Sequence, residues 1–213
     1  SERKAEKYLK GELEQWADKV EMEDFSVHPA AFMGWIPAAG CIGIISVIFF
    51  WLTYKGVVSG PGLAIVATVF VLLALACLVI EFLMYREFVD FLFPRKVSRN
   101  VMARRAPSGE VKRRIIFGGH TDAANEWTYS LHGGLKSLAT VMSGSICGLI
   151  AVAIFDVIWV IHACVSGVYI SKFWLVCGII QLILIPFFFA ICFFINWKVV
   201  VDGANDNLTA DFI

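Results

Sequence analysis

The sequence predicts an α/β domain, with a mixed sheet and flanking helices, that is interrupted twice by transmembrane helical hairpins. Three observations lead to this fold class. The composition is 59% hydrophobic and only 17% charged, against roughly 45–50% and about 25% in soluble domains. The apolar residues gather in four long stretches that form two pairs. The polar segments around these stretches carry helix and strand patterns of their own.

Each of the four apolar stretches is long enough to cross a membrane as a helix. They run from Trp35 to Tyr54, from Gly62 to Met84, from Leu138 to Ala163 and from Phe173 to Trp197. About 20 predominantly apolar residues cover a hydrocarbon core of about 30 Å. The linkers within each pair, 55–61 and 164–172, are short. Two transmembrane hairpins therefore result, and the lipid bilayer is the expected partner.

A hairpin returns the chain to the side that it left, which sets the domain organisation. Hairpins at 35–84 and 138–197 would leave the pieces 1–34, 85–137 and 198–213 on one face of the membrane. All but two of the eighteen Lys and Arg residues, Lys55 and Lys172, lie in these pieces. Basic residues near spans favour the cytoplasmic side, so an integral, multi-pass protein with cytoplasmic pieces is expected. The formal net charge is zero, which gives no general attraction to nucleic acid.

The polar pieces show the patterns of a single α/β domain. Residues 1–24 place apolar side chains at steps of three and four, which predicts an amphipathic helix. The stretch "EDFSVHP" predicts a short strand that ends at Pro29. Two runs on either side of "APSGE" predict a β-hairpin within residues 97–118.

The second run of that hairpin ends in "GGHTDAA", where His120 and Asp122 lie one residue apart. Residues two apart in an extended segment point the same way. A metal-bound imidazole needs an acceptor for its other ring nitrogen, and a carboxylate often supplies it. His120 is thus a candidate ligand and Asp122 a candidate partner that orients it. The alternative is that both side chains lie on a solvated loop.

A second stretch, "VDGANDNLTA", follows the fourth apolar segment. Asp206 lies there, close behind a glycine-containing turn, and is a candidate metal ligand. The alternative is that Asp206 and Asn207 cap the helix that "NLTA" would begin.

Taken together, "GGHTDAA" and "DGANDNLTA" resemble the first two metal-binding motifs of metallopeptidase family 28. This family includes zinc aminopeptidases and enzymes of the glutamate carboxypeptidase II type. The segments "ERKAEKYLKGELEQWAD" and "NVMARRAPSGEVKRRIIFGGHTD" resemble the family's first helix and the strands that lead to the metal. A sister family of the same clan also begins with Gly-His-x-Asp, but "GANDN" favours family 28.

The resemblance implies a zinc-peptidase-like domain that hydrolyses peptide bonds, with peptides as substrates and an exopeptidase as the expected type. His120 would bind one of two zinc ions, Asp206 would bridge both, and Asp122 would orient the histidine. Two such ions polarise a carbonyl group and generate a nucleophile from water near neutral pH. Substrate, end-preference and oligomeric state are not specified by the sequence.

The chain departs from the family pattern in the distance between the motifs. His120 and Asp206 lie 86 positions apart, because the second hairpin separates them. Both ends of the chain look cut, and the later ligands and the general base are expected beyond residue 213. The alternative function is therefore a catalytically inactive peptidase-like membrane scaffold or a transporter-like protein.

A few polar residues lie inside the apolar stretches. Asp156 is expected to pair with a polar group of another span, such as Gln181, with a transport or proton-relay role as the alternative. His162, six residues further along, does not share its helical face. Glu81 lies near the cytoplasmic end of its span and is expected to reach toward the membrane surface.

Overall fold

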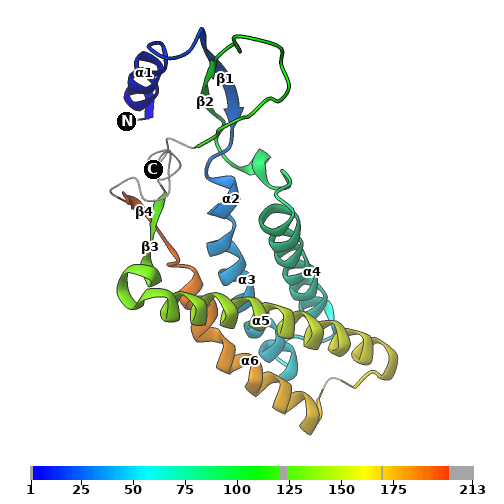
Figure 1. Ribbon diagram of the computed structural model, residues 1–213. Coiled ribbons are helices and arrows are strands. Elements are labelled where there is room, and N and C mark those ends of the chain that lie inside the picture. The colour runs from blue at the N-terminus through cyan, green and yellow to red at the C-terminus, as the bar shows by residue number, and fades with distance from the viewer. Residues whose placement is uncertain (1, 120–123, 169, 202–213) are drawn as a thin grey trace. The chain divides into compact units, whose positions relative to one another are not determined.

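The computed structural model describes residues 2–119, 124–168 and 170–201, and it divides into two compact units (Figure 1). The strand unit comprises residues 1–29, 94–126 and 197–213. The helical unit comprises residues 30–93 and 127–196. Each unit is thus assembled from segments that are far apart in the sequence.

In the strand unit, a short helix precedes a pair of antiparallel strands. Helix α1 spans Glu2–Leu13, strand β1 spans Lys19–Val27 and strand β2 spans Lys96–Arg104. The strands pair in register from Lys19 opposite Arg104 to Val27 opposite Lys96. The Arg99 side chain forms an ion pair with Asp24 directly across the ladder.

Two expectations for this unit are wrong. The amphipathic helix ends at Leu13 instead of continuing to residue 24, because "KVEMEDFSV" alternates with period two and enters the sheet. The hairpin expected within 97–118 does not form in the described residues, since β2 pairs with β1. One cross-strand pair of opposite charge, Asp24 opposite Arg99, favours this pairing.

The helical unit contains four helices, each long and apolar enough to cross a membrane: Ala31–Tyr54, Gly62–Leu83, Thr128–Ser166 and Lys172–Ile191. The first consists of α2 (Ala31–Gly34) and α3 (Ile36–Tyr54), and the second of α4 (Gly62–Cys77) and the π-helical turn η1 (Leu78–Leu83). The third is α5 (Thr128–Ser166) and the fourth α6 (Lys172–Ile191). A 3-10 turn, η2 (Asp90–Leu92), follows η1.

The third and fourth helices differ from the expected spans at their strand-side ends. Helix α5 begins ten residues before Leu138, and its axis breaks at Gly134, which has a φ of 62°. Helix α6 ends at Ile191 instead of reaching Trp197. Strands β3 (Asn125–Trp127) and β4 (Ile195–Val200) pair here. The apolar run that ends at Trp197 therefore combines a helix and a strand, which hydrophobicity alone does not separate.

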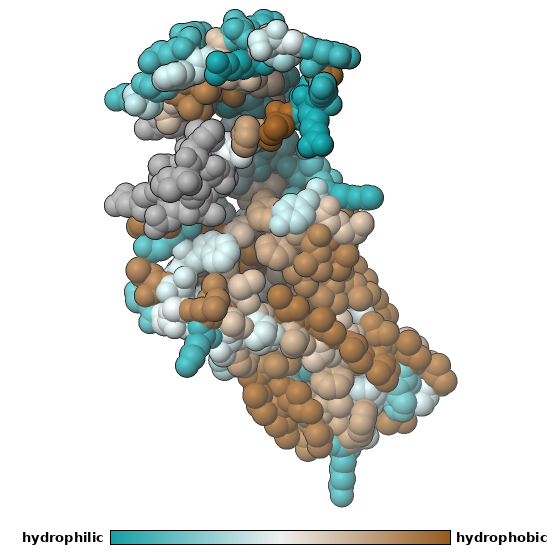
Figure 2. Space-filling model, in the orientation of Figure 1, coloured by the Kyte–Doolittle hydropathy of each residue, from teal (hydrophilic) through white to brown (hydrophobic). Residues whose placement is uncertain are grey.

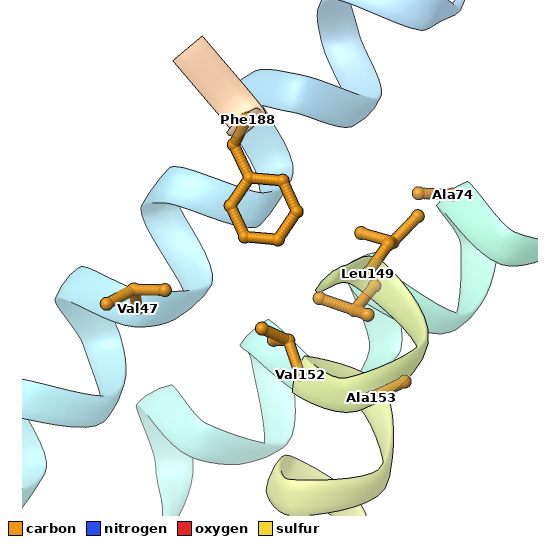
Figure 3. Close-up of a cluster of buried hydrophobic side chains, with 7 residues drawn as sticks. Val47, Ala74, Leu149, Val152, Ala153 and Phe188 are labelled. Carbon is orange, nitrogen blue, oxygen red and sulfur yellow. The ribbon is translucent and has the colours of Figure 1, made fainter. Parts of the chain in front are cut away.

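The four long helices form a bundle in which α3 and α5 each pack against both α4 and α6 (Figure 1). A first apolar cluster fills the bundle, and the Phe188 ring lies among side chains of the neighbouring helices (Figure 3). Its buried members are Val47, Val71, Ala74, Leu149, Val152, Ala153 and Phe188. A second cluster consists of Phe50, Tyr54, Ala64, Trp159, Trp174 and Cys177.

The outward-facing side chains of the bundle are also apolar. Figure 2 shows hydrophobic residues over the visible surface of the helical unit. Large exposed examples are Ile48, Phe70, Ile158 and Ile183. A helix that is hydrophobic all round belongs in a membrane or in a large protein core, so lipid tails are the natural solvent for these faces.

Candidate functional site

The three residues of the expected metal site, His120, Asp122 and Asp206, lie outside the described residues. The nearest described positions are Gly119 and Ala124 around the first motif, and Val201 before the second. Within 2–119, 124–168 and 170–201, no group of three or more His, Cys, Asp and Glu side chains is arranged to hold a metal ion.

The segments that flank the two motifs are hydrogen-bonded to each other. The Val201 N–H donates to the carbonyl of Ala124 with an N–O distance of 3.0 Å. At the other end of the strand pair, the Thr128 N–H donates to the carbonyl of Phe194, also at 3.0 Å. The order of these bonds makes β3 and β4 antiparallel. The second hairpin is thereby inserted between two paired strands, and its two ends meet.

This pairing joins the described backbone that borders the two motifs. Ala124 follows Asp122 by two residues, and Val201 precedes Asp206 by five.

A second polar site lies inside the helical unit, around Asp156. This residue is only 2% exposed. Its Oδ2 atom lies 2.5 Å from Ser46 Oγ on α3, and its Oδ1 atom accepts a hydrogen bond of 3.0 Å from Gln181 Nε2 on α6. The expected pairing of Asp156 with Gln181 is confirmed. Ser46 was not expected, and its sequence signal is weak: one small hydroxyl residue in a long apolar stretch.

Close helix packing brings these three side chains together. A Cβ atom at Gly43, on α3 one turn before Ser46, would lie 2.8 Å from the Phe188 ring. A Cβ atom at Gly178, on α6 one turn before Gln181, would lie 2.5 Å from the Phe50 ring. Small residues at helix contacts let backbones approach closely in membranes. His162 is exposed, and its ring lies beside that of Trp174 on α6, away from this site.

Glu81 has a different environment from the one expected. The residue lies in the π-helical turn η1 and is 5% exposed, so its carboxyl group is enclosed by the protein. Its Oε2 atom accepts the backbone N–H groups of Phe88 and Val89, at 2.8 and 3.1 Å. A buried carboxylate that accepts backbone N–H groups fixes the loop that supplies them. Glu81 thus anchors the chain where it leaves the second span.

The helical unit also contains an apolar cavity of about 70 Å³. Aromatic and aliphatic side chains line it, among them Trp35, Phe82 and Met142. The hydroxyl of Ser145, its polar lining residue, donates to carbonyls of α5 and α6. The cavity therefore offers shape and hydrophobic contact but no reactive group.

The chain was compared with protein-family models, with curated proteins and with solved structures, and it matches none of them. The geometry of the β3–β4 pair and of the Asp156 site is therefore the basis for a function.

Proposed function

We propose that the chain is part of a membrane-embedded, zinc-dependent peptidase whose metal site is shared by the segments on either side of the second hairpin. One observation carries the proposal beyond the sequence resemblance, namely the hydrogen bond between Val201 and Ala124. This bond supports the proposal because it joins Ala124, which follows His120 and Asp122, to Val201, which precedes Asp206.

The residues of the two motifs suit zinc. Imidazole nitrogen and carboxylate oxygen are both good zinc ligands, and His120 and Asp206 would supply one of each. The Asp122 carboxylate would accept a hydrogen bond from the second ring nitrogen of His120 and hold its orientation. A zinc pair, when bound, polarises a carbonyl group and activates water for hydrolysis. A peptide bond is the substrate that the family resemblance implies, at a chain end if the protein is an exopeptidase.

The test is the zinc content of the purified protein, compared between the wild type, His120→Ala and Asp206→Ala. The protein should include any sequence that continues past Ile213, because the resemblance assigns further ligands and the general base to that region. His132→Ala is the matched control, since this exposed histidine contacts a backbone carbonyl of its own helix. We expect about two zinc ions per chain in the wild type and in the control, and a clear loss in both other variants.

A wild-type protein without bound zinc would favour the second candidate function. If the wild type binds no zinc, the hydrolase proposal fails. An inactive peptidase-like scaffold or a transporter-like protein then remains, and the buried polar site around Asp156 would be its most distinctive feature. If zinc is bound but is equally retained in His120→Ala and Asp206→Ala, the metal lies elsewhere.

We further propose that the strand unit faces the cytoplasm. The argument is the distribution of basic residues, since Lys55 and Lys172 alone lie at the hairpin tips. Epitopes inserted after Ser59 and after Ser108 in intact cells would test it. Antibody access to the first insertion but not to the second is expected. The reverse pattern would show that the strand unit lies on the other side of the membrane.

A further inference from the structure

The environment of Asp156 raises the question of how a carboxyl group is tolerated inside the bundle. Ser46 and Gln181 lie near the middle of α3 and α6, and Asp156 of α5 meets them there; all three are at most 2% exposed. Apolar layers lie on both sides along α5, with Val152 one turn before Asp156 and Trp159 one turn after it. The site is therefore at the depth where a charge is most costly in a membrane.

No positive side chain neutralises Asp156 among the residues that the structure describes. Its hydrogen-bond partners there are Ser46 and Gln181, both uncharged, and no Lys, Arg or His forms an ion pair with it. Apart from Asp156, the titratable side chains of the four packed helices are Cys41, Tyr54, Cys77, Glu81, Tyr129, His132, Lys136, Cys147, His162, Cys164, Lys172 and Cys177. The Glu81 carboxyl accepts the backbone N–H groups of Phe88 and Val89 and is not paired with Asp156. Lys172, Lys136 and His132 lie far along their helices from this layer, and His162 is exposed.

The distances around the carboxyl group determine which cation fits. Ser46 Oγ lies 2.5 Å from Oδ2, and Gln181 Nε2 lies 3.0 Å from Oδ1. These are hydrogen-bond separations, and they leave no space for a metal ion between the paired atoms. A proton on Oδ2 fits the separation from Ser46, because a hydroxyl group can accept a hydrogen bond from a carboxylic acid O–H as well as donate one to a carboxylate. Oδ1 then remains the acceptor of the Gln181 N–H.

Gln181 supplies a second, independent indication. Its Oε1 atom is fully buried and has no hydrogen-bond partner in the described part of the chain. Buried acceptors are normally satisfied. If the amide were turned over, this oxygen would lie beside Oδ1, where an acid O–H would satisfy it. The amide can therefore serve a protonated carboxyl group in either orientation.

We propose that Asp156, Ser46 and Gln181 form an intramembrane proton-binding site, in which the carboxyl group of Asp156 holds a proton at neutral pH. The site connects both hairpins, since Ser46 belongs to the first, and Asp156 and Gln181 belong to the second. Loss of the proton would leave an unpaired charge in the bundle, so proton binding stabilises the packing of the two hairpins. This inference uses the membrane-crossing helices and is independent of the metal site.

Infrared spectroscopy of the full protein in lipid nanodiscs tests the proposal directly. A protonated carboxyl group has a C=O stretching band that an ionised one lacks, and the band shifts on exchange into D₂O. We expect this band in the wild type at pH 7, its loss in Asp156→Asn, and its retention in Glu87→Gln, which removes an exposed carboxyl group of the same unit. Sodium and potassium buffers at the same pH should give the same band.

A second variant separates proton binding from a purely structural role. Ser46→Ala keeps Asp156 but removes the acceptor of its proton, so the band should move to the position of a more weakly hydrogen-bonded acid. The proposal would be overturned if the spectra of the wild type and of folded Asp156→Asn did not differ in the region of the carboxylic acid C=O band. A band that is lost when sodium replaces potassium would also overturn it, because a metal ion would then be the ligand. An unmoved band in Ser46→Ala would equally contradict the assigned geometry.

Discussion

Glu81 gives the sharpest prediction about the helical unit. Its Oε2 atom accepts the N–H groups of Phe88 and Val89 and so holds the loop between the second span and β2. Glu81→Ala removes this acceptor and leaves both donors without a partner. Val89 is buried at 6% exposed, whereas Phe88 is half-buried. Water can therefore replace the carboxylate at Phe88 more readily than at Val89.

These exposures set the expected size of the effect. An unsatisfied buried donor costs about 1–3 kcal/mol, which applies fully to Val89 and in part to Phe88. Glu81→Ala should therefore lower the free energy of unfolding by about 2–4 kcal/mol. Glu81→Gln keeps an acceptor and loses only the charge assistance, so about 1 kcal/mol is expected. Glu87→Ala, at an exposed position nearby, should stay within about 0.5 kcal/mol of the wild type.

The assay is equilibrium unfolding in mixed micelles, followed by circular dichroism, together with amide hydrogen exchange of Phe88 and Val89. Both amides should exchange faster in Glu81→Ala than in Glu87→Ala. If the two alanine variants unfold with the same free energy and the Val89 amide stays equally protected, the carboxylate does not anchor this loop and the reasoning is refuted.

Two further predictions concern the two units separately. The Arg99 guanidinium holds the pKa of Asp24 below its ordinary value, chiefly through their hydrogen bonds. The contribution of this pair to stability is therefore present above the ordinary pKa of an aspartate and is lost as the pH falls through the lowered one. Thermal unfolding across a pH series should show a gap between wild type and Asp24→Asn that is constant near neutral pH and closes in acid; a gap that widens in acid would reverse the sign. In the helical unit, Gly43→Ala would place a Cβ atom 2.8 Å from the Phe188 ring and should cost about 1–3 kcal/mol. Gly62→Ala, with no atom within 4 Å of its Cβ, is the control, and equal stability of the two variants would contradict the packing.

The sequence was most informative where one property dominates over many residues. Four apolar stretches of sufficient length predict four membrane-crossing helices, and the structure has four helices that meet this description. The pairing of Asp156 with Gln181 was also predictable, because a buried polar group in an apolar bundle needs a partner. The sequence was ambiguous where one stretch fits both a helix and a strand. The apolar run of α6 continues through Phe193 and Phe194 to Ile195 and Trp197 of β4. The alternation of "KVEMEDFSV" lies close behind a helical pattern.

The amino-acid sequence by itself determined which segments suit a lipid environment and which suit water, since hydrophobicity and charge are properties of the residues alone. It also supplied the two motifs on which the zinc proposal depends. The tertiary structure alone decided which segments meet: β1 with β2, β3 with β4, and Ser46 with Asp156. These contacts join residues up to 110 positions apart. The helix contacts depend on how closely two backbones approach at glycines, and the strand contacts depend on which strand pairs with which. Neither can be read from a local sequence pattern.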